Sequence, residues 1–534
     1  MTINRRRFLQ ISITAAGGIA FTACNTDSSE SEAVTTVGEG SGSTIASETT
    51  TQSSPAVEST IAGPPTSGGT IRVAALAAPA DTMNPATVTG IMDYIAMFHI
   101  YDSLVLLQGG ELSNQLAESI EPNADATVWT LVLKDGPLFH DGTPVTATDV
   151  AYSLNLIGAS PNYAQFFALI DLANMQVVDD LTLVLPLNTP RGDLVETVLS
   201  QLSFVVPDGF TDWGNNIGSG PFRLSSYEPG IGATLERNPD YWGATPLLDT
   251  VEVIGIADPA ARLNALKSGD IDYATGIPAA GAASEASNSD IEIRRGGPAN
   301  STMRCFAMNV KIAPFDNPDV VLACKLAIDR QAMIDVVLFG EGLLGNDMPS
   351  KNMPGYNDDV PQIERDVDRA RQLFADAGVT EFTIKAADFI AGVVASAELY
   401  AQQLSEAGVT VTVDKADPTT YFDDFATVLS TPCQGFYFIN RPAITHVGSY
   451  TGSAAAFNVT GFGTPEFDAA LAAAQATPDA DERTAQVQAL LATIHDEDGF
   501  IVWAFEEQLD ASRPGIDGVR VTQSVPLFWE ATIS

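Results

Sequence analysis

Basic and metal-binding side chains are scarce in this chain of 534 residues. It has 26 Lys and Arg against 67 Asp and Glu, which gives a formal net charge of −41, and it has only four His. Binding of nucleic acid or of an anionic lipid surface needs a basic footprint, so the composition argues against both functions. A negative charge of this size keeps a protein soluble and makes its copies repel one another. We therefore expect a monomer with no nucleic-acid partner.

Several catalytic and metal-binding motifs are missing as well. The sequence has no G-x-S-x-G elbow, no H-E-x-x-H pair and no C-x-x-C pair. Its four histidines, His99, His140, His446 and His495, are spread along the chain. We therefore expect no catalytic residues, no cofactor and no metal site, and a protein that is not an enzyme.

Cysteine is also rare. Cys305, Cys324 and Cys433 are the cysteines outside the first 24 residues. Outside the cytoplasm, two of them could form a disulfide and leave one free thiol. Alternatively, all three are buried and act as small hydrophobic side chains. The sequence leaves both alternatives open.

The N-terminus has the pattern of an export signal. A basic head is followed by the apolar run 11–23, which is too short to cross about 30 Å of hydrocarbon. Arg5-Arg6-Arg7-Phe8-Leu9 resembles the twin-arginine (Tat) motif, which exports folded proteins. Residues 21–24, Phe-Thr-Ala-Cys, resemble a bacterial lipobox, with Phe21 where an aliphatic residue is usual. These resemblances imply a signal peptide over 1–23 and a lipoprotein acylated at Cys24, anchored to the outer face of the cell membrane, in the periplasm or cell-wall space.

The segment after the signal differs in composition from the rest of the chain. Residues 25–69 are rich in Ser, Thr, Gly and Glu and contain no Lys or Arg. Such a segment cannot bury a core, so residues 24–69 are expected to form a flexible acidic tether.

From Gly69 onward the pattern predicts alternating strands and helices. The predicted strands are 70–74, 128–133, 250–256, 382–386, 409–413 and 501–505, and the predicted helices are 260–268, 319–339, 366–377, 393–406, 467–475 and 481–496. Alternation over most of the length is typical of an α/β protein.

His140 and Asp141 stand side by side and could form a catalytic pair. The local pattern favours a structural interpretation, because Asp141-Gly142 is a turn signal. Thr146 and Asp149 form a predicted capping box at the start of a helix. An exported hydrolase that uses His140 and Asp141 stays open as an alternative.

The same stretch, Phe139-His140-Asp141-Gly142-Thr143-Pro144-Val145-Thr146-Ala147, resembles a signature of the family 5 extracellular solute-binding proteins. These are dipeptide-, oligopeptide- and nickel-binding receptors of ABC importers. Further blocks of the family pattern are Gly218–Phe222, Arg237–Gly243, Ala265–Asp272, Ala327–Arg330 and Pro465–Asp468. Their order supports the resemblance over residues 69–534.

The resemblance implies a two-lobed periplasmic-binding-protein fold of type II, cluster C, with an extra domain inserted in the first lobe. Lobe I would comprise residues 69–102, 204–303 and 504–534, the inserted domain 103–203, and lobe II 304–503. Ligand would bind in the interlobe cleft, hinge closure would bury it, and the closed complex would deliver it to a membrane permease.

The expected ligand-binding region departs from the pattern of the peptide receptors. Where those receptors carry an aspartate for the peptide's α-amino group, this chain has Asn440 and Arg441. An arginine would favour a carboxylate or another anion through a bidentate contact. Phe436 and Tyr437 could form an apolar wall. Alternatively, these aromatic residues lie in a buried strand and Arg441 pairs with an acid.

Other residues near the crossings between lobes are expected to contact the ligand. They are Met303, Asn309, Phe457, Asn458, Trp503 and Asn84. The expected ligand is a peptide or related small organic solute. A receptor for a non-peptide anionic solute or for a nickel complex remains an alternative.

Overall fold

The computed structural model describes residues 68–534. The predicted signal peptide, Cys24 and the tether up to residue 67 lie outside the described residues. No helix in residues 68–534 is long and apolar enough to span a membrane. The chain is α/β, and its largest two hydrophobic cores form around two different sheets.

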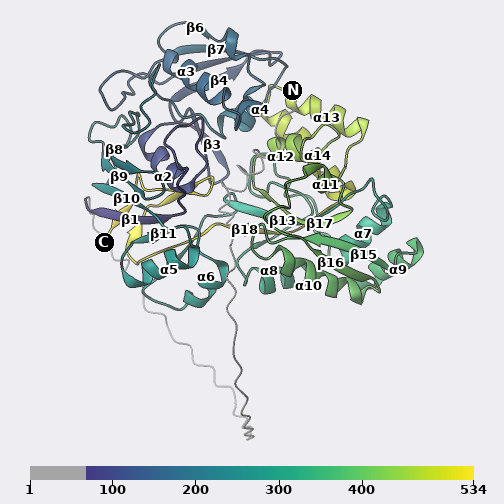
Figure 1. Ribbon diagram of the computed structural model, residues 1–534. Helices are drawn as coiled ribbons and strands as arrows, with labels where there is room; N and C mark the ends of the chain where they lie inside the picture. The colour runs from purple at the N-terminus through teal and green to yellow at the C-terminus, as the bar shows by residue number, and fades with distance from the viewer. Residues whose placement is uncertain (1–67) are drawn as a thin grey trace, which may run out of the picture. The chain divides into compact units, whose positions relative to one another are not determined.

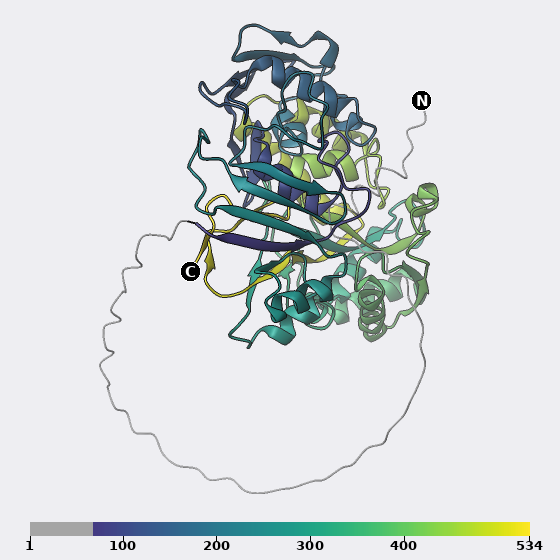
Figure 2. The same ribbon diagram turned by 60° about the vertical axis from the view of Figure 1, so that its left-hand side comes forward.

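The first large sheet has seven strands, in the order β12-β19-β11-β1-β10-β9-β8. Their bounds are β1 Thr70–Ala75, β8 Phe222–Glu228, β9 Gly232–Arg237, β10 Thr250–Gly255, β11 Tyr273–Ala274, β12 Glu292–Arg295 and β19 Leu509–Ser512. β1 pairs in parallel with β10 and β11, so it lies inside the sheet, as Figure 2 shows. β1 reads Thr-Ile-Arg-Val-Ala-Ala, and its buried Ile71 and Val73 enter one core while Ala74 enters another. We call the part of the chain around this sheet lobe I.

The helices of lobe I lie against this sheet and its neighbours. They are α2 Ile91–Ile100, α5 Pro259–Ser268 and α6 Ala279–Glu285. α2 is buried at nine of its ten residues, Tyr94 being the exception, because it packs against β8, β9, β10 and β22. Gly269 ends α5 in the left-handed conformation, with φ of 79°, as its sequence position predicts.

Two smaller four-stranded sheets are built largely from residues 105–186. One has the order β4-β5-β7-β6 and is covered by α3, and the other has the order β22-β21-β2-β3. The bounds are β2 Val105–Gln108, β3 Glu111–Asn114, β4 Ala117–Pro122, β5 Val128–Leu133, β6 Gln176–Val177, β7 Thr182–Pro186, β20 Ile516–Asp517, β21 Arg520–Thr522, β22 Val525–Leu527, β23 Thr532–Ile533, α3 Ala147–Gly158, α4 Ala164–Phe167, the 3₁₀-helix η1 Leu172–Asn174 and the π-helix η2 Val195–Leu199. Buried residues of these elements share one hydrophobic core with the seven-stranded sheet, so we include them in lobe I.

The second large sheet has six strands, in the order β14-β18-β13-β17-β15-β16. Its strands are β13 Ser301–Met308, β14 Leu343–Leu344, β15 Glu381–Ala386, β16 Thr410–Lys415, β17 Cys433–Ile439 and β18 Phe500–Glu507. Its helices are α7 Pro318–Ala327, α8 Arg330–Val337, α9 Val367–Ala377, α10 Val393–Glu406, α11 Phe425–Leu429, α12 Ala443–Tyr450, α13 Pro465–Ala476 and α14 Ala480–Glu497. Its core draws only on residues 303–505, and we call this part lobe II. α12, α13 and α14 pack together as one group (Figure 1).

The chain passes between the two large sheets twice. It leaves β12 at Arg295 and enters β13 at Ser301, and it returns from β18 at Glu507 to β19 at Leu509. The two passages are hydrogen-bonded to each other, since the Gln508 N–H donates to Asn300 O at 2.9 Å. β12 pairs with β19 and β13 with β18, so a two-stranded ribbon joins the lobes. The residue boundaries of the domains stay a prediction.

Most of the predicted elements are confirmed, but one is wrong. The predicted helix over 319–339 is two helices, α7 and α8, separated at Ile328-Asp329. Ile328 has extended backbone angles, and the Asp329 carboxylate accepts a hydrogen bond from the Ala332 N–H at 2.9 Å. The apolar periodicity continues across this break, so it concealed an aspartate that starts a new helix.

The predicted structural role of the His140 region is supported by its contacts. Asp141 accepts a hydrogen bond from the Thr143 N–H, and Asp149 accepts one from the Thr146 N–H at 2.8 Å as part of the predicted capping box. His140 Nε2 lies 3.0 Å from Gly220 O, and Nδ1 accepts from the Gly218 N–H at 3.3 Å. Burial lowers the pKa of His140 to about 4. The neutral His140 ring therefore holds the 218–220 loop in place.

Asp102 is a second buried polar centre in lobe I. It accepts hydrogen bonds from Tyr241 Oη at 3.0 Å, from Trp242 Nε1 at 2.7 Å and from Gln115 Nε2 at 2.6 Å. Burial raises its pKa to about 6. These contacts give Tyr241 and Trp242 a structural role in lobe I.

Candidate functional site

Two cavities meet at the boundary between the lobes, and both are lined by Arg441. The first, which we call the polar cavity, has a volume of about 60 Å³. It is lined by Leu107, Gly109, Gly110, Gln201, Ala299, Asn300, Ser301, Met353, Ile439, Asn440, Arg441, Gln523 and Ser524. The second, which we call the aromatic cavity, has a volume of about 80 Å³. It is lined by Ile91, Tyr94, Phe98, Asn162, Tyr163, Phe166, Phe167, Val198, Gln201, Leu202, Arg441, Gln523 and Val525.

Arg441 stands in the loop between β17 and α12, where Pro442 directly precedes the helix. Its Nη1 donates to Oε1 of Gln201 in lobe I, and its Nε has no hydrogen-bond partner. Arg304 and Arg483 of the same lobe are buried, and each pairs with a glutamate. Arg441 forms no ion pair with any acid of residues 68–534, so the alternative that it pairs with an acid is wrong for the described part of the chain.

Neither cavity lining contains an aspartate, a glutamate or a lysine. Arg441 is therefore the only formally charged residue in the two linings, within a chain whose net charge is −41. Tyr94 and Tyr163 occupy the aromatic cavity, with their hydroxyl oxygens 2.9 Å apart, and Tyr163 donates to Val88 O at 2.8 Å. Burial raises the pKa of both phenols, which keeps them neutral. The site is suited to hold one negative charge.

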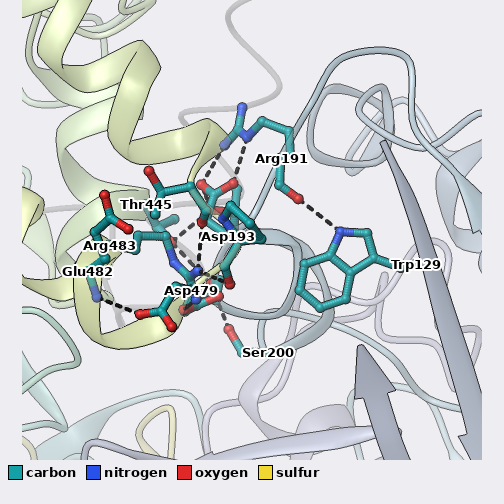
Figure 3. A network of polar contacts seen from close by, with 12 residues as sticks. Trp129, Arg191, Asp193, Ser200, Thr445, Asp479, Glu482 and Arg483 are labelled. Carbon is teal, nitrogen blue, oxygen red and sulfur yellow. Dashed lines mark hydrogen bonds and ion pairs between the residues drawn. The ribbon is translucent and has the colours of Figure 1, made fainter. Parts of the chain in front are cut away.

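Close to the cavities, a group of polar contacts joins the lobes, and we call it the latch. Arg483 of α14 donates from Nη2 to Glu196 Oε1 of η2 at 2.6 Å. Thr445 of α12 donates to Glu196 O at 3.1 Å, and the Gly192 N–H donates to Gln475 O at 2.7 Å. Figure 3 shows Arg483 and Thr445 on the helices of lobe II meeting the segment that carries Asp193.

The lobe I side of the latch is held by its own buried contacts. Asp193, which is fully buried, accepts from both Nε and Nη2 of Arg191 at 2.6 Å and from the Thr197 hydroxyl at 2.8 Å. Trp129 of β5 donates from Nε1 to Arg191 O at 2.8 Å (Figure 3). This fixes the 191–197 segment before it meets lobe II.

Comparisons with known proteins identify the family of the chain. The sequence profile described as "Bacterial extracellular solute-binding proteins, family 5 Middle" matches residues 111–431. The chain belongs to this family. A glutathione-binding protein of Pectobacterium atrosepticum is 28% identical over 276 residues, which are 50% of this chain and 53% of that relative. The chain thus spans about half the length of the curated relatives that it matches.

Solved structures share the fold over most of the chain. The ABC transporter substrate-binding protein CtaP of Listeria monocytogenes is 22% identical, with a TM-score of 0.76 over 88% of this chain and 99% of that one. The binding protein AgaA of A. tumefaciens R10, solved in complex with agropinic acid, is 25% identical, with a TM-score of 0.67 over 87% of this chain and 99% of that one. The two-lobed fold of this family 5 protein is therefore shown.

The structure places two of the predicted site residues, Arg441 and Asn440, in a cavity lining. Asn440 is buried, and its amide donates to Lys351 O at 2.8 Å and to Pro298 O at 3.2 Å. Its Oδ1 has no partner in the described chain. Asn440 therefore ties Pro298, in the passage between the lobes, to lobe II, and its Oδ1 is buried.

The structure does not bring the other predicted residues to the two cavities. Phe436 and Tyr437 are buried and pack against Phe389, while Met303 and Trp503 are buried in the lobe II core. Backbone contacts engage the amides of Asn309, Asn458 and Asn84, and Phe457 packs on Phe425. A ligand role for these residues stays a prediction.

Gln201, Gln523, Tyr94 and Tyr163 are the residues that the sequence interpretation missed. They come from segments far apart in the chain, and none lies in a motif of the family. Only the fold brings them together around Arg441. In residues 68–534, no group of three His, Cys, Asp or Glu side chains is arranged to hold a metal ion.

Proposed function

We propose that this family 5 protein is the solute-binding component of an ABC importer. It captures a peptide or related small organic solute between its lobes and delivers it to a membrane permease. The observation that carries the proposal is the Arg441 guanidinium, which faces Gln201 of lobe I, lines both cavities and has no acidic partner in the described chain. A ligand that binds there contacts both lobes and so favours the closed form.

Several features support a receptor rather than an enzyme. Both ring nitrogens of His140 are engaged by backbone groups of the 218–220 loop, and Asp141 is engaged by Thr143. A general base needs a nitrogen that is free to accept a proton from the substrate. The latch supports a closing motion, since its partners belong to different lobes.

The nature of the relatives also supports a small organic solute. A curated relative is named for binding glutathione, and AgaA was solved with agropinic acid. Membrane attachment is part of the proposal: Cys24 is acylated after removal of residues 1–23, and residues 24–69 tether the lobes to the outer face of the membrane.

Identification of the solute tests the proposed function directly. Protein purified without denaturation is extracted, and the extract is analysed by mass spectrometry and titrated back onto ligand-free protein. The proposal expects an intact solute that binds and compacts the protein in small-angle X-ray scattering. Recovery of hydrolysed product alone, together with measurable turnover that His140→Asn abolishes, would instead establish the hydrolase alternative.

The lipid anchor is tested separately. Cys24→Ala is expected to move the protein from the membrane fraction to the soluble extracytoplasmic fraction and to remove the label from a radioactive fatty acid. Cys305→Ala is the matched control, because that cysteine is buried in the lobe II core. Unchanged membrane attachment of the Cys24→Ala variant contradicts the anchor and leaves the binding function standing.

A further inference from the structure

The charge and polarity of the two cavities constrain the ligand beyond its being a small solute. The linings offer one guanidinium, several amides and hydroxyls, and no carboxylate. A charged amine buried in a protein needs a carboxylate partner, since its desolvation is otherwise uncompensated. Beside Arg441 it would also meet a like charge. The linings therefore disfavour a ligand with a free ammonium group.

The donor groups of Arg441 suit a carboxylate. Nη1 is engaged by Gln201, while Nε is without a partner. The Nε and Nη2 edge of a guanidinium presents two parallel N–H groups, which match the two oxygens of a carboxylate. Because Arg441 has no acid of the described chain beside it, a ligand anion replaces the missing counter-charge instead of competing with one.

The aromatic cavity suits an apolar body on the same molecule. Its lining is mostly apolar, and Phe98, Phe167 and Val198 are buried in the lobe I core. Burial of apolar ligand surface there stabilises binding through the hydrophobic effect. The polar cavity shares Gln201, Arg441 and Gln523 with the aromatic cavity, and it is also lined by Asn300, Ser301 and Asn440.

We propose that the ligand class is an amphipathic monoanion: a carboxylic acid with an aromatic or branched aliphatic body and no charged amine, such as an N-acylated amino acid or peptide. Its carboxylate binds Arg441, its apolar body fills the aromatic cavity, and its blocked amide faces the polar cavity. This inference rests on the proposed receptor function and narrows it.

A matched set of three probes tests the inference by isothermal titration calorimetry on the purified full-length protein. The probes are N-acetyl-Leu-Phe, with one negative charge, Leu-Phe, with a free ammonium group, and N-acetyl-Leu-Phe amide, which is neutral. N-acetyl-Leu-Phe is expected to bind at least tenfold more tightly than either of the others.

Two variants test whether the Arg441 guanidinium causes the tighter binding of N-acetyl-Leu-Phe. Arg441→Gln is expected to raise the Kd of N-acetyl-Leu-Phe at least 30-fold and to change the Kd of the neutral amide less than threefold. Arg369→Gln is the matched control, because Arg369 is exposed on α9. Thermal unfolding of each variant, followed by circular dichroism, verifies that it folds.

Several outcomes overturn the inference. They are equal or tighter binding of Leu-Phe, an equal loss of the acid and the amide in Arg441→Gln, or a solute extracted from native protein that carries an ammonium group. The last result leaves the receptor function intact. If no probe binds, an extracted solute that is a blocked acid supports the inference, and an extracted solute of any other class overturns it and leaves the receptor function intact.

Discussion

Arg483 Nη2 lies 2.6 Å from Glu196 Oε1, and the two side chains belong to different lobes. Their exposed fractions are 7% and 15%, so the ion pair is largely shielded from water. In an open form both groups would be solvated separately. Under the proposed function we therefore expect the pair to act on the equilibrium between open and closed forms rather than on the fold of either lobe.

Glu196→Gln is expected to weaken solute binding. Removing one partner of a shielded, hydrogen-bonded ion pair costs about 2 kcal/mol, which corresponds to roughly a 30-fold increase in Kd. Calorimetry with the solute extracted from native protein measures the change. The double variant with Arg483→Gln should lose little more than either single one. An additive loss would contradict direct coupling of the two residues.

Gly192→Ala is expected to hinder closure by steric contact. A Cβ at this position would lie 1.8 Å from Thr477 O, which belongs to the opposite lobe. The variant should keep the melting temperature of the ligand-free protein and lose at least tenfold in affinity. Gly214→Ala is the matched control, because the nearest atom to its added Cβ, Asp212 Oδ1, is 3.7 Å away. Equal affinities in the two variants would show that the close approach does not govern binding.

His446→Leu is expected to make the protein more resistant to acid. Neither ring nitrogen of His446 has a partner in residues 68–534, and burial, assisted by Arg441, lowers the pKa of this ring to about 3. The unfolded ring titrates near 6.5, so between these values the unfolded chain binds one more proton. The contribution of neutral His446 to the free energy of unfolding is greatest above pH 6.5. Below that pH it falls by about 1.4 kcal/mol per pH unit.

Urea unfolding at pH 7 and pH 5 measures this effect. Between the two pH values, the stability difference between His446→Leu and the unmodified protein should shift by about 2 kcal/mol in favour of the variant. A difference that stays constant with pH would mean that His446 is protonated in the folded protein.

Asp102→Ala is expected to destabilise lobe I without direct effect on the cavities. It leaves the donors of Gln115, Tyr241 and Trp242 without their acceptor, which costs about 3 kcal/mol. Asp240→Ala, in the same motif as Tyr241 but exposed, should cost less than about 1 kcal/mol. Thermal unfolding compares the two, and similar losses would refute the structural role given to Asp102.

The three described cysteines are expected to be unreactive in the folded protein. Cys305, Cys324 and Cys433 are free and buried, and burial raises the pKa of Cys324 to about 12. A chromogenic thiol reagent should react with these cysteines only after denaturation. A reducing agent should leave the melting temperature of the protein unchanged. Fast labelling of the native protein would contradict their burial.

Local patterns predicted much of the fold. The strands over 128–133 and 250–256 alternate regularly, and glycines end α5 and α9 where expected. The break at Asp329 was missed because the apolar periodicity continues through it. The capping side chain of Asp329 starts a new helix although the apolar periodicity continues, so periodicity alone does not determine where helices end.

The site was predictable only in part. Arg441 stood out because it replaces an expected acid, and it does lie at both cavities. Asn309 and Asn458 were expected at the ligand, but their amides satisfy nearby carbonyl groups. Gln201 and Gln523 have no local signal, because their place beside Arg441 depends on long-range packing of both lobes.

The ribbon formed by β12–β13 and β18–β19 determines how the lobes can move. Its two strands are bonded to each other on both sides of the passage, through Asn300 and Gln508 among others. Sliding one strand along the other would break every rung of this ladder, whereas twisting the ribbon keeps the rungs intact. We therefore expect twisting of this ribbon to be the main motion between the lobes, so that a solute bound at Arg441, as proposed, would change a single interlobe angle.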